Sequence, residues 1–492
     1  MTAARLSHLL QGLADPASAA GLQVAGISSD SRTVEAGWLF VAAPGVRGDG
    51  REYLNGAIAR GAAAVAYEPD DPLPSGERFR MPDVPVPAIP VPRLRYRIGL
   101  IADRFFGSPS QKLFVVGVTG TNGKTTCTHL LAQILDEPGG RCGLIGTLGA
   151  GFPGRLDPSS HTTPDPVSVH RLLAGFVAAG AESACMEVSS HALDQRRVEA
   201  VAFDVAVFTN LTRDHLDYHG SMESYAQSKA RLFEFPGLAA AVINCDDPFG
   251  QRLAREARTR VNVTTFGTGD ADIRATEIRP TAEGLGVQVM TPAGPVALRS
   301  SLIGRFNAMN LLAVLAVLLV AGLPLARAAE RIALVRPVSG RMERFGGDSA
   351  PLVVVDYAHT PDALHKALAA LREHTSGRLW CVFGCGGERD RGKRPLMGRL
   401  AEDLADIVIV TDDNPRHESP EQIIADIAGG MRLQPTVVRD RAHAINMAIG
   451  SAAAGDAVLI AGKGHETYQQ IGDRRLHFSD REVVMEILGA AA

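Results

Sequence analysis

The sequence is poor in cysteine, and none of its cysteines forms a CxxC pair. Only six are present among 492 residues, and several of them lie inside apolar runs. Cys381 and Cys385 are the two that stand closest together in the chain, and two thiols alone do not make a structural metal site. We therefore expect buried thiols in a protein of a reducing compartment, the cytoplasm.

The sequence also lacks an apolar run long enough to cross a bilayer. The uncharged stretch 311–326 is short for a membrane span, and Gly322 and Pro324 interrupt it. We expect a buried helix there instead. The first residues show no basic start followed by an apolar run, so we expect no signal peptide.

A surplus of positive charge is missing as well. Lysine and arginine number 50, aspartate and glutamate number 54, and the net charge is −4. This balance does not indicate binding to nucleic acid or to an anionic membrane, so we expect neither as a partner. If the substrates are polyanions, the positive charge that binds them must be local. A folded chain of this length, with 46% apolar residues, is expected to form about three domains.

What the sequence does contain is a glycine-rich loop in the setting of a phosphate site. Residues 113–135 read as an apolar strand, the loop GVTGTNGKTT (117–126) and a helix. In such a loop backbone N–H groups surround phosphate oxygens, Lys124 would reach the β- and γ-phosphates, and the Thr125 hydroxyl would bind Mg²⁺. The usual pattern asks for glycine where this chain has Val118, so we predict a variant loop. An ordinary strand–helix turn is the alternative.

Alternating strand-like and helix-like runs predict an α/β fold with three domains. Residues 1–92 would form a small N-terminal α/β domain that ends in a proline-rich linker, 71–92. Residues 93–336 would form a central domain with a P-loop-type parallel sheet, and residues 337–492 a Rossmann-like C-terminal α/β domain. Ligands bind at the carboxyl ends of the strands in such sheets. The polar segments expected there are 187–191, 210–217, 356–362, 384–390, 411–416 and 462–466.

Two of the polar side chains that follow strands suit a metal ion. Glu187 ends an apolar strand, where an unpaired carboxylate would be costly. A Mg²⁺ ion shared with Thr125 and ATP phosphates would satisfy it. His215 could bind a second metal ion. The residues alone leave open that Glu187 pairs with an arginine and that His215 is structural.

Five motifs together resemble the Mur ligase family of peptidoglycan synthesis. They are TGTNGKTT (119–126), MEVSSH (186–191), NLTRDHLD (210–217), DYAHTPD (356–362) and DNPR (413–416). They occur in family order, and the likeness extends over nearly the whole chain. It is greatest to the members that add meso-diaminopimelate.

The resemblance implies a reaction. ATP would phosphorylate the D-glutamate γ-carboxylate of UDP-N-acetylmuramoyl-L-alanyl-D-glutamate. An amine of meso-diaminopimelate would attack the acyl phosphate, with ADP and phosphate as the other products. Positioning and charge neutralisation would lower the barrier. We expect a monomer acting on small molecules, with a UDP-binding N-terminal domain, an ATP-binding central domain and an amino-acid-binding C-terminal domain.

The resemblance also implies the site residues. Those for ATP are Gly120, Thr121, Asn122, Gly123, Lys124, Thr125, Thr126, Asn307, Asn310 and Arg341. Those for catalysis and metal are Thr125, Lys124, Glu187, His215 and Lys229, the last as a carbamate. Those for the UDP-sugar-peptide are Ser29, Ser31, Val46, Arg47, Gly48, Thr162, Thr163, Ser189, Gln195 and Arg197. The family often has asparagine at the position of His161. Without the resemblance, Lys229 would read as a surface lysine on a helix.

The last group of implied residues would select the amino acid. Those for diaminopimelate are Arg389, Asp413, Asn414, Pro415, Arg416, Gly462 and Glu466. The guanidinium of Arg416 would clamp the distal carboxylate, which lysine lacks, and Glu466 would suit the distal ammonium. Lysine-adding relatives lack arginine at this position. The alternatives are the same ligase with L-lysine, a folylpolyglutamate synthase-like ligase, and, from another class, a P-loop switch.

Overall fold

The computed structural model describes residues 3–45, 48–69, 79–136, 141–159, 161–281, 284–347 and 350–489. The chain divides into two compact units by its internal contacts. The first comprises Met1–Thr119, Leu135–Ala206 and Gln227–Ala239, and the second comprises Gly120–Ile134, Val207–Ala226 and Ala240–Ala492. Strand β12 (Val205–Phe208), helix α4 (Lys124–Leu135) and helix α8 (Met222–Ala230) are divided between the units.

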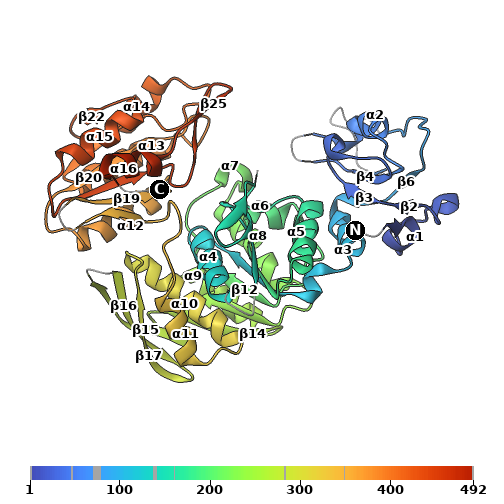
Figure 1. Cartoon of the computed structure of the whole chain (residues 1–492), viewed down its shortest axis with the longest axis horizontal. Helices are drawn as coiled ribbons and strands as arrows, with labels where there is room; N and C mark the ends of the chain where they lie inside the picture. Colours follow the sequence, from blue (N-terminus) through green and yellow to red (C-terminus); the bar gives the residue numbers. More distant parts are fainter. Residues whose placement is uncertain are drawn as a thin grey trace. The chain divides into compact units, whose positions relative to one another are not determined.

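The first unit contains two groups of strands and short helices (Figure 1). Its strands are β1 (Ala4–Arg5), β2 (Gln23–Val24), β3 (Gly26–Ser28), β4 (Trp38–Ala42), β5 (Ala64–Tyr67), β6 (Ala88–Pro90), β7 (Phe114–Thr119), β8 (Cys142–Gly146), β9 (Gly149–Phe152), β10 (Arg155–Asp157) and β11 (Ser183–Glu187). Its helices are α1 (Leu6–Leu9), α2 (Leu54–Ala59), α3 (Ile98–Phe106), α5 (Pro166–Ala178) and α6 (Ser190–Asp194).

The strands β3, β4, β5 and β6 form a parallel sheet that is buried on both faces. Successive side chains of a strand point to opposite faces. Leu39 and Val41 of β4 therefore pack in the cluster with α1 and α3, whereas Phe40 packs with α2 on the other face. The expected linker 71–92 needs correction, because β6 within it pairs with β5; residues 71–78 lie outside the described part. Pro90 is tolerated because β6 is an edge strand.

The other strands of the first unit follow the order β10-β9-β8-β11-β7. β8, β11 and β7 are parallel, as the sequence predicts, and each is a short apolar run. β9 and β10 extend this edge as antiparallel strands, which the alternation of strands and helices did not predict. The parallel strands place their carboxyl ends, with Glu187 at the end of β11, at one edge.

The second unit begins with further strands of α/β type and continues into the C-terminal sheet. Its strands are β13 (Ala240–Asn244), β14 (Asn262–Gly267), β15 (Ile273–Thr281), β16 (Gly284–Thr291), β17 (Gly294–Ser300), β18 (Glu343–Gly346), β19 (Leu352–Asp356), β20 (Leu379–Phe383), β21 (Ile407–Val410), β22 (Thr436–Val437), β23 (Ala457–Ala461), β24 (Tyr468–Ile471) and β25 (Arg474–His477). Its helices are α7 (Leu216–His219), α9 (Pro248–Ala257), α10 (Arg305–Val320), α11 (Leu325–Ala333), α12 (Pro361–Glu373), α13 (Lys393–Leu404), α14 (Pro420–Ala428), α15 (Arg441–Ser451) and α16 (Asp480–Leu488).

An antiparallel meander, β15–β16–β17, follows the parallel pair β13–β14. It lies beside α10 and α11 (Figure 1). The meander was not predicted, although GLGVQVMT (284–291) alternates buried and exposed side chains over most of its length. α10 confirms the expected buried helix but begins at Arg305 and ends at Val320. In the described part of the chain, no helix has the length and apolar character needed to cross a membrane.

The C-terminal sheet has the order β18-β19-β23-β20-β21-β22, with β18 antiparallel and the others parallel. Val354 packs with α12, α13 and α14 on one face, and its neighbours Val353 and Val355 pack with α15 and α16 on the other. Strands buried on both faces are continuous apolar runs, which is why the sequence shows them so clearly. The predicted parallel α/β domain is confirmed here.

Several helices of both units begin in the same way, with a capping side chain followed by proline. Asp165, Asp247, Thr360 and Ser419 each accept a hydrogen bond from a backbone N–H of the first turn, and the next residue is proline. The cap satisfies an N–H that has no partner within the helix, and proline has the backbone angle of that position already fixed. These short signals fix where each helix begins.

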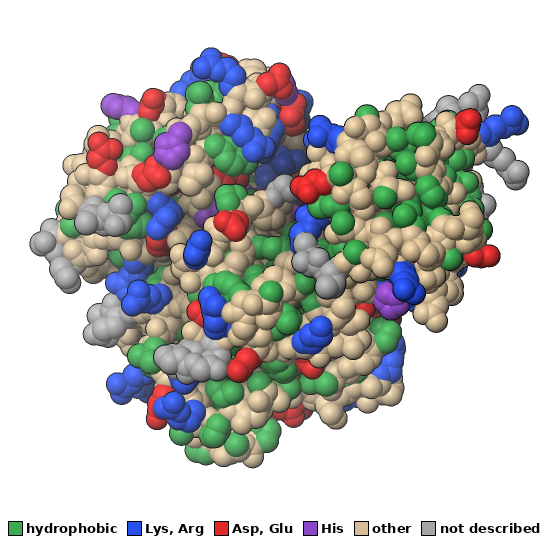
Figure 2. Space-filling view, turned by 45° about the vertical axis from the view of Figure 1, so that its right-hand side comes forward, with side chains coloured by type: hydrophobic (Ala, Val, Ile, Leu, Met, Phe, Trp, Pro, Cys, Tyr) green, Lys and Arg blue, Asp and Glu red, His purple; other side chains and the backbone are tan. Residues whose placement is uncertain are grey.

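The cysteines and the surface charges agree with the composition. Five of the six cysteines are buried, and Cys245 is partly buried. On the face shown in Figure 2, the coloured basic side chains are interspersed with acidic ones and do not form one continuous basic surface.

Candidate active site

The glycine-rich loop lies between β7 and α4, as predicted. Val118 is buried within β7, so the departure from the usual glycine pattern belongs to the strand and not to the loop. Gly120 (φ +149°) and Gly123 (φ +87°) supply the backbone conformations that bend the loop. A Cβ atom at Gly120 would lie 1.9 Å from Thr209 Oγ1. The Lys124 ammonium donates to the carbonyl oxygens of Gly120 and Thr121, over 2.8 and 2.9 Å.

The segment 209–212 holds this loop by hydrogen bonds. Asn122 N–H donates to Asn210 Oδ1 over 2.9 Å, and Asn210 Nδ2 donates to Asn122 O over 3.0 Å. Thr209 Oγ1 donates to the same carbonyl oxygen over 2.6 Å. Thr121 Oγ1 lies 3.1 Å from Tyr225 OH, a residue that the sequence analysis missed. The motifs 119–126 and 210–217 therefore meet at Thr121 and Asn122.

His215 lies at the start of α7 in a left-handed conformation (φ +52°), which is unusual for a residue other than glycine. Its Nε2 lies 3.4 Å from Asp214 Oδ2. Burial raises the pKa of Asp214, but the nearby His215, His359 and Lys124, with a hydrogen bond from the His215 backbone, outweigh burial and lower that pKa overall. The carboxylate beside His215 is thus held in its charged form.

Two asparagines and an arginine lie next to the loop. Asn310 Nδ2 donates to Asn307 Oδ1 over 2.8 Å on α10. A Cβ atom at Gly123 would lie 2.6 Å from Asn310 Oδ1, so the amide faces the loop closely. Arg341 Nη2 donates to Thr125 Oγ1 over 3.3 Å, and its guanidinium lies over the Tyr357 ring. Thr126 is buried in the first turn of α4.

Glu187 is fully buried at the end of β11. Its Oε1 accepts from Thr147 N–H over 2.7 Å, and its Oε2 from Thr147 Oγ1 over 3.1 Å. A Cβ atom at Gly146 would lie 2.4 Å from Oε1, so only glycine leaves room for the carboxylate. Thr147 was missed as a site residue. It is the last residue of the strand expected over 143–147, and a hydroxyl at the carboxyl end of a strand was the available signal.

The residues predicted for the muramoyl peptide form one hydrogen-bonded network around Glu187. Thr163 Oγ1 donates to Glu187 O over 2.8 Å and accepts from Ser189 N–H over 3.1 Å. Arg197 Nη1 donates to Thr163 O over 2.8 Å, and its Nη2 donates to Gln195 Oε1 over 2.7 Å. Residues from three segments are thereby brought together.

Two further residues, His161 and Thr162, directly precede Thr163 of the network. Thr162 Oγ1 lies 3.1 Å from Thr147 Oγ1, which links it to Glu187 through Thr147. His161 is exposed, and its N–H lies 3.4 Å from Ser159 Oγ.

The predicted uridine residues lie in the N-terminal sheet region. Ser29 Oγ donates to Asp165 Oδ1, the cap of α5, over 3.4 Å. Ser31 begins a short helical turn capped by Asp30, and Gly48 O accepts from Gly45 N–H over 2.8 Å. Val46 and Arg47 lie outside the described residues.

Lys229 needs a correction. The residue is 1% exposed on α8 and is not a surface lysine, contrary to what its sequence alone suggests. Its burial comes from tertiary packing, which a short polar helix does not reveal. Among the described residues, no group of three or more His, Cys, Asp and Glu side chains is arranged for a metal ion. Oxygen donors such as the Glu187 carboxylate and the Thr125 hydroxyl are nevertheless of the type that Mg²⁺ prefers.

The predicted amino-acid residues gather at the carboxyl ends of β20, β21 and β23. Asn414 Nδ2 donates to Glu466 Oε2 over 2.8 Å. Lys463, which is fully buried and was not predicted, donates to Asn414 Oδ1 over 3.1 Å and to Glu466 Oε2 over 3.0 Å. A Cβ atom at Gly462 (φ +118°) would lie 2.7 Å from Asp413 Oδ2. Glu466 thus already has two partners in the protein.

Arg416 and Arg389 belong to the same region. Arg416 has a left-handed backbone (φ +53°), and its Nη1 donates to Gly387 O over 2.7 Å. A Cβ atom at Gly386 would lie 3.0 Å from Arg416 Nη1 and 3.7 Å from Arg389 Cγ. Arg389 is exposed, and Pro415 stands between Asn414 and Arg416 in the chain.

Comparison with known proteins gives the family. Three family models match successive segments: the Mur ligase family catalytic domain over residues 23–106, the Mur ligase middle domain over 118–318, and the Mur ligase glutamate ligase domain over 340–464. The predicted three-domain α/β architecture is confirmed, while the exact domain limits stay predictions.

Relatives that cover the whole chain agree with these models. UDP-N-acetylmuramoyl-L-alanyl-D-glutamate--2,6-diaminopimelate ligase of Alkalilimnicola ehrlichii is 52% identical over 492 residues, 99% of each chain. The enzyme of the same name from Pseudomonas aeruginosa is 51% identical over 96% of this chain and 97% of its own.

Solved structures show the same fold. A structure of a ligase of that name has a TM-score of 0.72 and 36% identity over 99% of both chains. MurF from Acinetobacter baumannii, at 20% identity over 99% of both chains and a TM-score of 0.69, shares the fold. A folylpolyglutamate synthase from Mycobacterium tuberculosis shares it over 73% of this chain and 91% of its own, with 21% identity and a TM-score of 0.61. By its sequence relatives and its architecture, the chain belongs to the Mur ligase family.

Proposed function

We propose that this chain is an ATP-dependent ligase that joins meso-diaminopimelate to the D-glutamate γ-carboxylate of UDP-N-acetylmuramoyl-L-alanyl-D-glutamate, in peptidoglycan precursor synthesis. The observation that carries the proposal is the likeness, at about half identity over the whole chain, to ligases named for this reaction. The cluster of Asn414, Arg416 and Glu466 supports the choice of amino acid, because it offers a cation to the distal carboxylate and an anion to the distal ammonium of diaminopimelate.

The phosphate end of ATP would bind at the glycine-rich loop. The backbone of 120–123 and the Lys124 ammonium supply positive potential there, with Arg341 beside Thr125. Asn307 and Asn310 would face the adenosine side, and Thr126 would complete the first turn of α4. Transfer of the γ-phosphoryl group to the substrate carboxylate gives an acyl phosphate and ADP. Attack by the amine then forms the amide, with loss of phosphate and a proton.

Magnesium would be held by oxygen donors, Thr125 and Glu187, and a second ion would involve His215. Bound Mg²⁺ supplies neutralisation of phosphate charge. Lys229 would take part as a carbamate, formed from its amine and carbon dioxide with release of a proton. Its burial fits a role inside the site better than a surface role. Thr147 would orient the Glu187 carboxylate through its two hydrogen bonds.

The UDP-sugar-peptide would bind to the residues named for it in the first unit. The network of Thr163, Ser189, Gln195 and Arg197 offers hydroxyl, amide and guanidinium groups to the peptide, together with Thr162. Ser29, Ser31, Val46, Arg47 and Gly48 would face the uridine. We propose a monomer that acts in the cytoplasm on small molecules, with domains at 1–92, 93–336 and 337–492.

The test is phosphate release in the presence of ATP, Mg²⁺ and the UDP-muramoyl dipeptide, with meso-diaminopimelate or L-lysine added in parallel. We expect turnover to require both the dipeptide and diaminopimelate. Arg416→Ala should lose about tenfold or more in kcat/KM for diaminopimelate, since it removes a charged hydrogen bond. Arg474→Ala, which removes an exposed arginine of the same domain, is the matched control. Equal use of lysine by the wild type would overturn the assignment of the amino acid. Turnover without the dipeptide would overturn the assignment of the chain as a ligase.

A further inference from the structure

Two segments that carry proposed amino-acid ligands follow neighbouring strands of the C-terminal sheet. β20 and β21 pair in parallel, so their carboxyl ends lie at the same edge. The segment after β20 (384–392) contains Arg389, and the segment after β21 (411–418) contains Arg416. The distance between the two guanidinium groups therefore depends on how firmly these two segments are joined.

The backbones of the two segments are in direct contact. Gly387 N–H donates to Asn414 O over 2.9 Å. A Cβ atom at Gly387 would lie 1.9 Å from Pro415 O, which leaves no room for any other residue. The side chain of Arg416 closes the contact by donating to Gly387 O.

An ion pair between Arg394 and Glu418 stabilises the contact between the two segments. The side chain of Arg394, in the first turn of α13, has no exposed area, and that of Glu418 is 9% exposed. Arg394 Nη1 and Nη2 donate to the two carboxylate oxygens of Glu418, each over 2.8 Å. Arg394 also donates to Gly386 O over 3.3 Å and to Asp426 Oδ2 over 2.8 Å. Hydrogen bonds from Arg394 lower the pKa of Glu418 to about 2, so the carboxylate stays charged.

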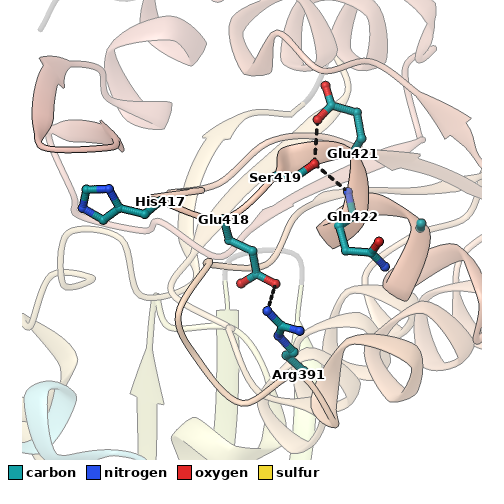
Figure 3. Close-up of a pocket in the computed structure, with 7 residues that line it drawn as sticks. Arg391, His417, Glu418, Ser419, Glu421 and Gln422 are labelled. Carbon is teal, nitrogen blue, oxygen red and sulfur yellow. Dashed lines mark hydrogen bonds and ion pairs between the residues drawn. The ribbon is translucent and has the colours of Figure 1, made fainter.

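Glu418 also holds the first segment directly. Its Oε2 accepts from Glu388 N–H over 3.0 Å, and its Oε1 lies 3.0 Å from Arg391 Nη2. Figure 3 shows Arg391 and Glu418 pointing toward each other in the wall of a surface pocket of about 690 Å³. The carboxylate thus contacts the residue next to Arg389 and lies two residues after Arg416.

Both segments hold an unfavourable backbone conformation at these points. Glu388 (φ +55°) and Arg416 (φ +53°) are in the left-handed region without being glycine. Such residues persist only where the surrounding contacts hold them. Glu388 is held through its N–H by Glu418, and Arg416 is held through its N–H by Gln470 O, over 3.0 Å.

We propose that Glu418 and Arg394 are positioning residues for amino-acid selection: their buried ion pair fixes the spacing of Arg389 and Arg416, so that an amino acid with a second carboxylate is favoured over lysine. The inference rests on the proposed function, in which both arginines bind diaminopimelate. Neither Glu418 nor Arg394 needs to touch the substrate. Their effect would pass through the backbone at Gly386 and Glu388.

The experiment measures KM and kcat for diaminopimelate, ATP and the UDP-muramoyl dipeptide in the wild type, Glu418→Gln and Glu418→Asp. We expect the KM for diaminopimelate to rise about tenfold in Glu418→Gln, as for the loss of a charged hydrogen bond, with the other two KM values within about twofold. The preference for diaminopimelate over lysine should fall by a similar factor. Glu418→Asp keeps the charge but shortens its reach, so it should show a smaller rise and serves if the first variant is poorly folded.

Glu402→Gln is the matched control. Like Glu418, Glu402 pairs with an arginine, accepts from backbone N–H and has a side chain that is 9% exposed, but its partners are Arg432 and Leu433. An equal rise in KM in this control, or an unchanged KM and unchanged preference in both Glu418 variants, would overturn the inference. A wild type that does not prefer diaminopimelate would instead overturn the proposed function, so the two failures are distinguishable.

Discussion

The glycine-rich loop and the amino-acid segments both follow strands of α/β sheets, yet they are built in different ways. The loop depends on backbone geometry: Gly120 and Gly123 have positive φ, and side chains there would collide with Thr209 and Asn310. The amino-acid segments depend on charged side chains from separate parts of the chain: Arg394 and Lys463, which are buried, and Glu418, whose side chain is 9% exposed. The loop is a run of ten consecutive residues that can be recognised in the sequence, whereas the charged side chains of the amino-acid segments come together only in the folded chain.

Gly120→Ala is expected to have the largest effect, because it alters the backbone on which the loop depends. The added Cβ would lie 1.9 Å from Thr209 Oγ1, at a φ of +149° that alanine adopts at a cost. Displacing the loop would misplace its N–H groups, so we expect kcat/KM for ATP to fall by about 10²- to 10³-fold. Steady-state phosphate release measures it.

Gly294→Ala is the control for this effect. Gly294 also has positive φ (+112°), but no heavy atom lies within 4 Å of its added Cβ. This variant should keep nearly normal activity, which separates backbone strain from the collision. If Gly120→Ala retained normal kinetics for ATP, a backbone-built phosphate site would be wrong.

Lys463→Met tests the amino-acid segments, where we expect a smaller effect. The substitution removes the buried partner of Glu466 and Asn414. The Glu466 carboxylate, whose side chain is 17% exposed, then loses the cation that orients it, so we expect the KM for diaminopimelate to rise about 10- to 100-fold, with the KM for ATP nearly unchanged.

The control for Lys463→Met is Lys112→Met, which removes an exposed lysine and should leave all three KM values near those of the wild type. A rise in the KM for ATP equal to that for diaminopimelate would show that Lys463 supports the whole unit and not the amino-acid site.

The difference between a local loop and side chains that meet only on folding also explains which parts of the structure could be predicted from the sequence. Strands buried on both faces, such as β19 and β23, are continuous apolar runs, and the glycine-rich loop is a local pattern, so both were found. The meander β15–β17 was missed because alternating strands and helices predict parallel strands only, whereas this segment has strands in direct succession.

Burial of a polar residue was the part that could not be predicted. Lys229 and Lys463 are buried but carry no local sign of burial, because burial depends on tertiary packing. Arg416 and Glu466 were named through the family resemblance, but their protein partners, Gly387 and Lys463, became visible only in the structure. Residue types indicate chemistry, whereas the orientation of a charged group depends on its tertiary partners.

The smallest predicted effect concerns the pH dependence of stability, and it separates buried histidines from a carboxylate held by an arginine. Around Arg341, burial and the guanidinium lower the pKa of His129 to about 4 and that of His465 to about 3. Burial and the nearby Lys393 lower the pKa of His359 to about 4. Glu418 shows the opposite case, because hydrogen bonds from Arg394 lower the pKa of its carboxyl group to about 2.

The histidines and Glu418 affect the free energy of unfolding in different pH ranges. Because the histidine pKa values lie below 6.5 in the folded state, the unfolded chain takes up protons first as the pH falls from 6.5 to about 4. The free energy of unfolding should then fall by about 1.4 kcal/mol per pH unit for each such histidine. The depressed pKa of Glu418 stabilises the fold above pH 4.5, and that contribution is lost only as the pH falls from 4.5 toward 2. Urea unfolding at pH 7.0, 5.5 and 4.5 measures the first window, where His465→Gln should reduce the slope and Glu418→Gln should not. A slope unchanged by His465→Gln would show that this histidine is not held neutral by the fold.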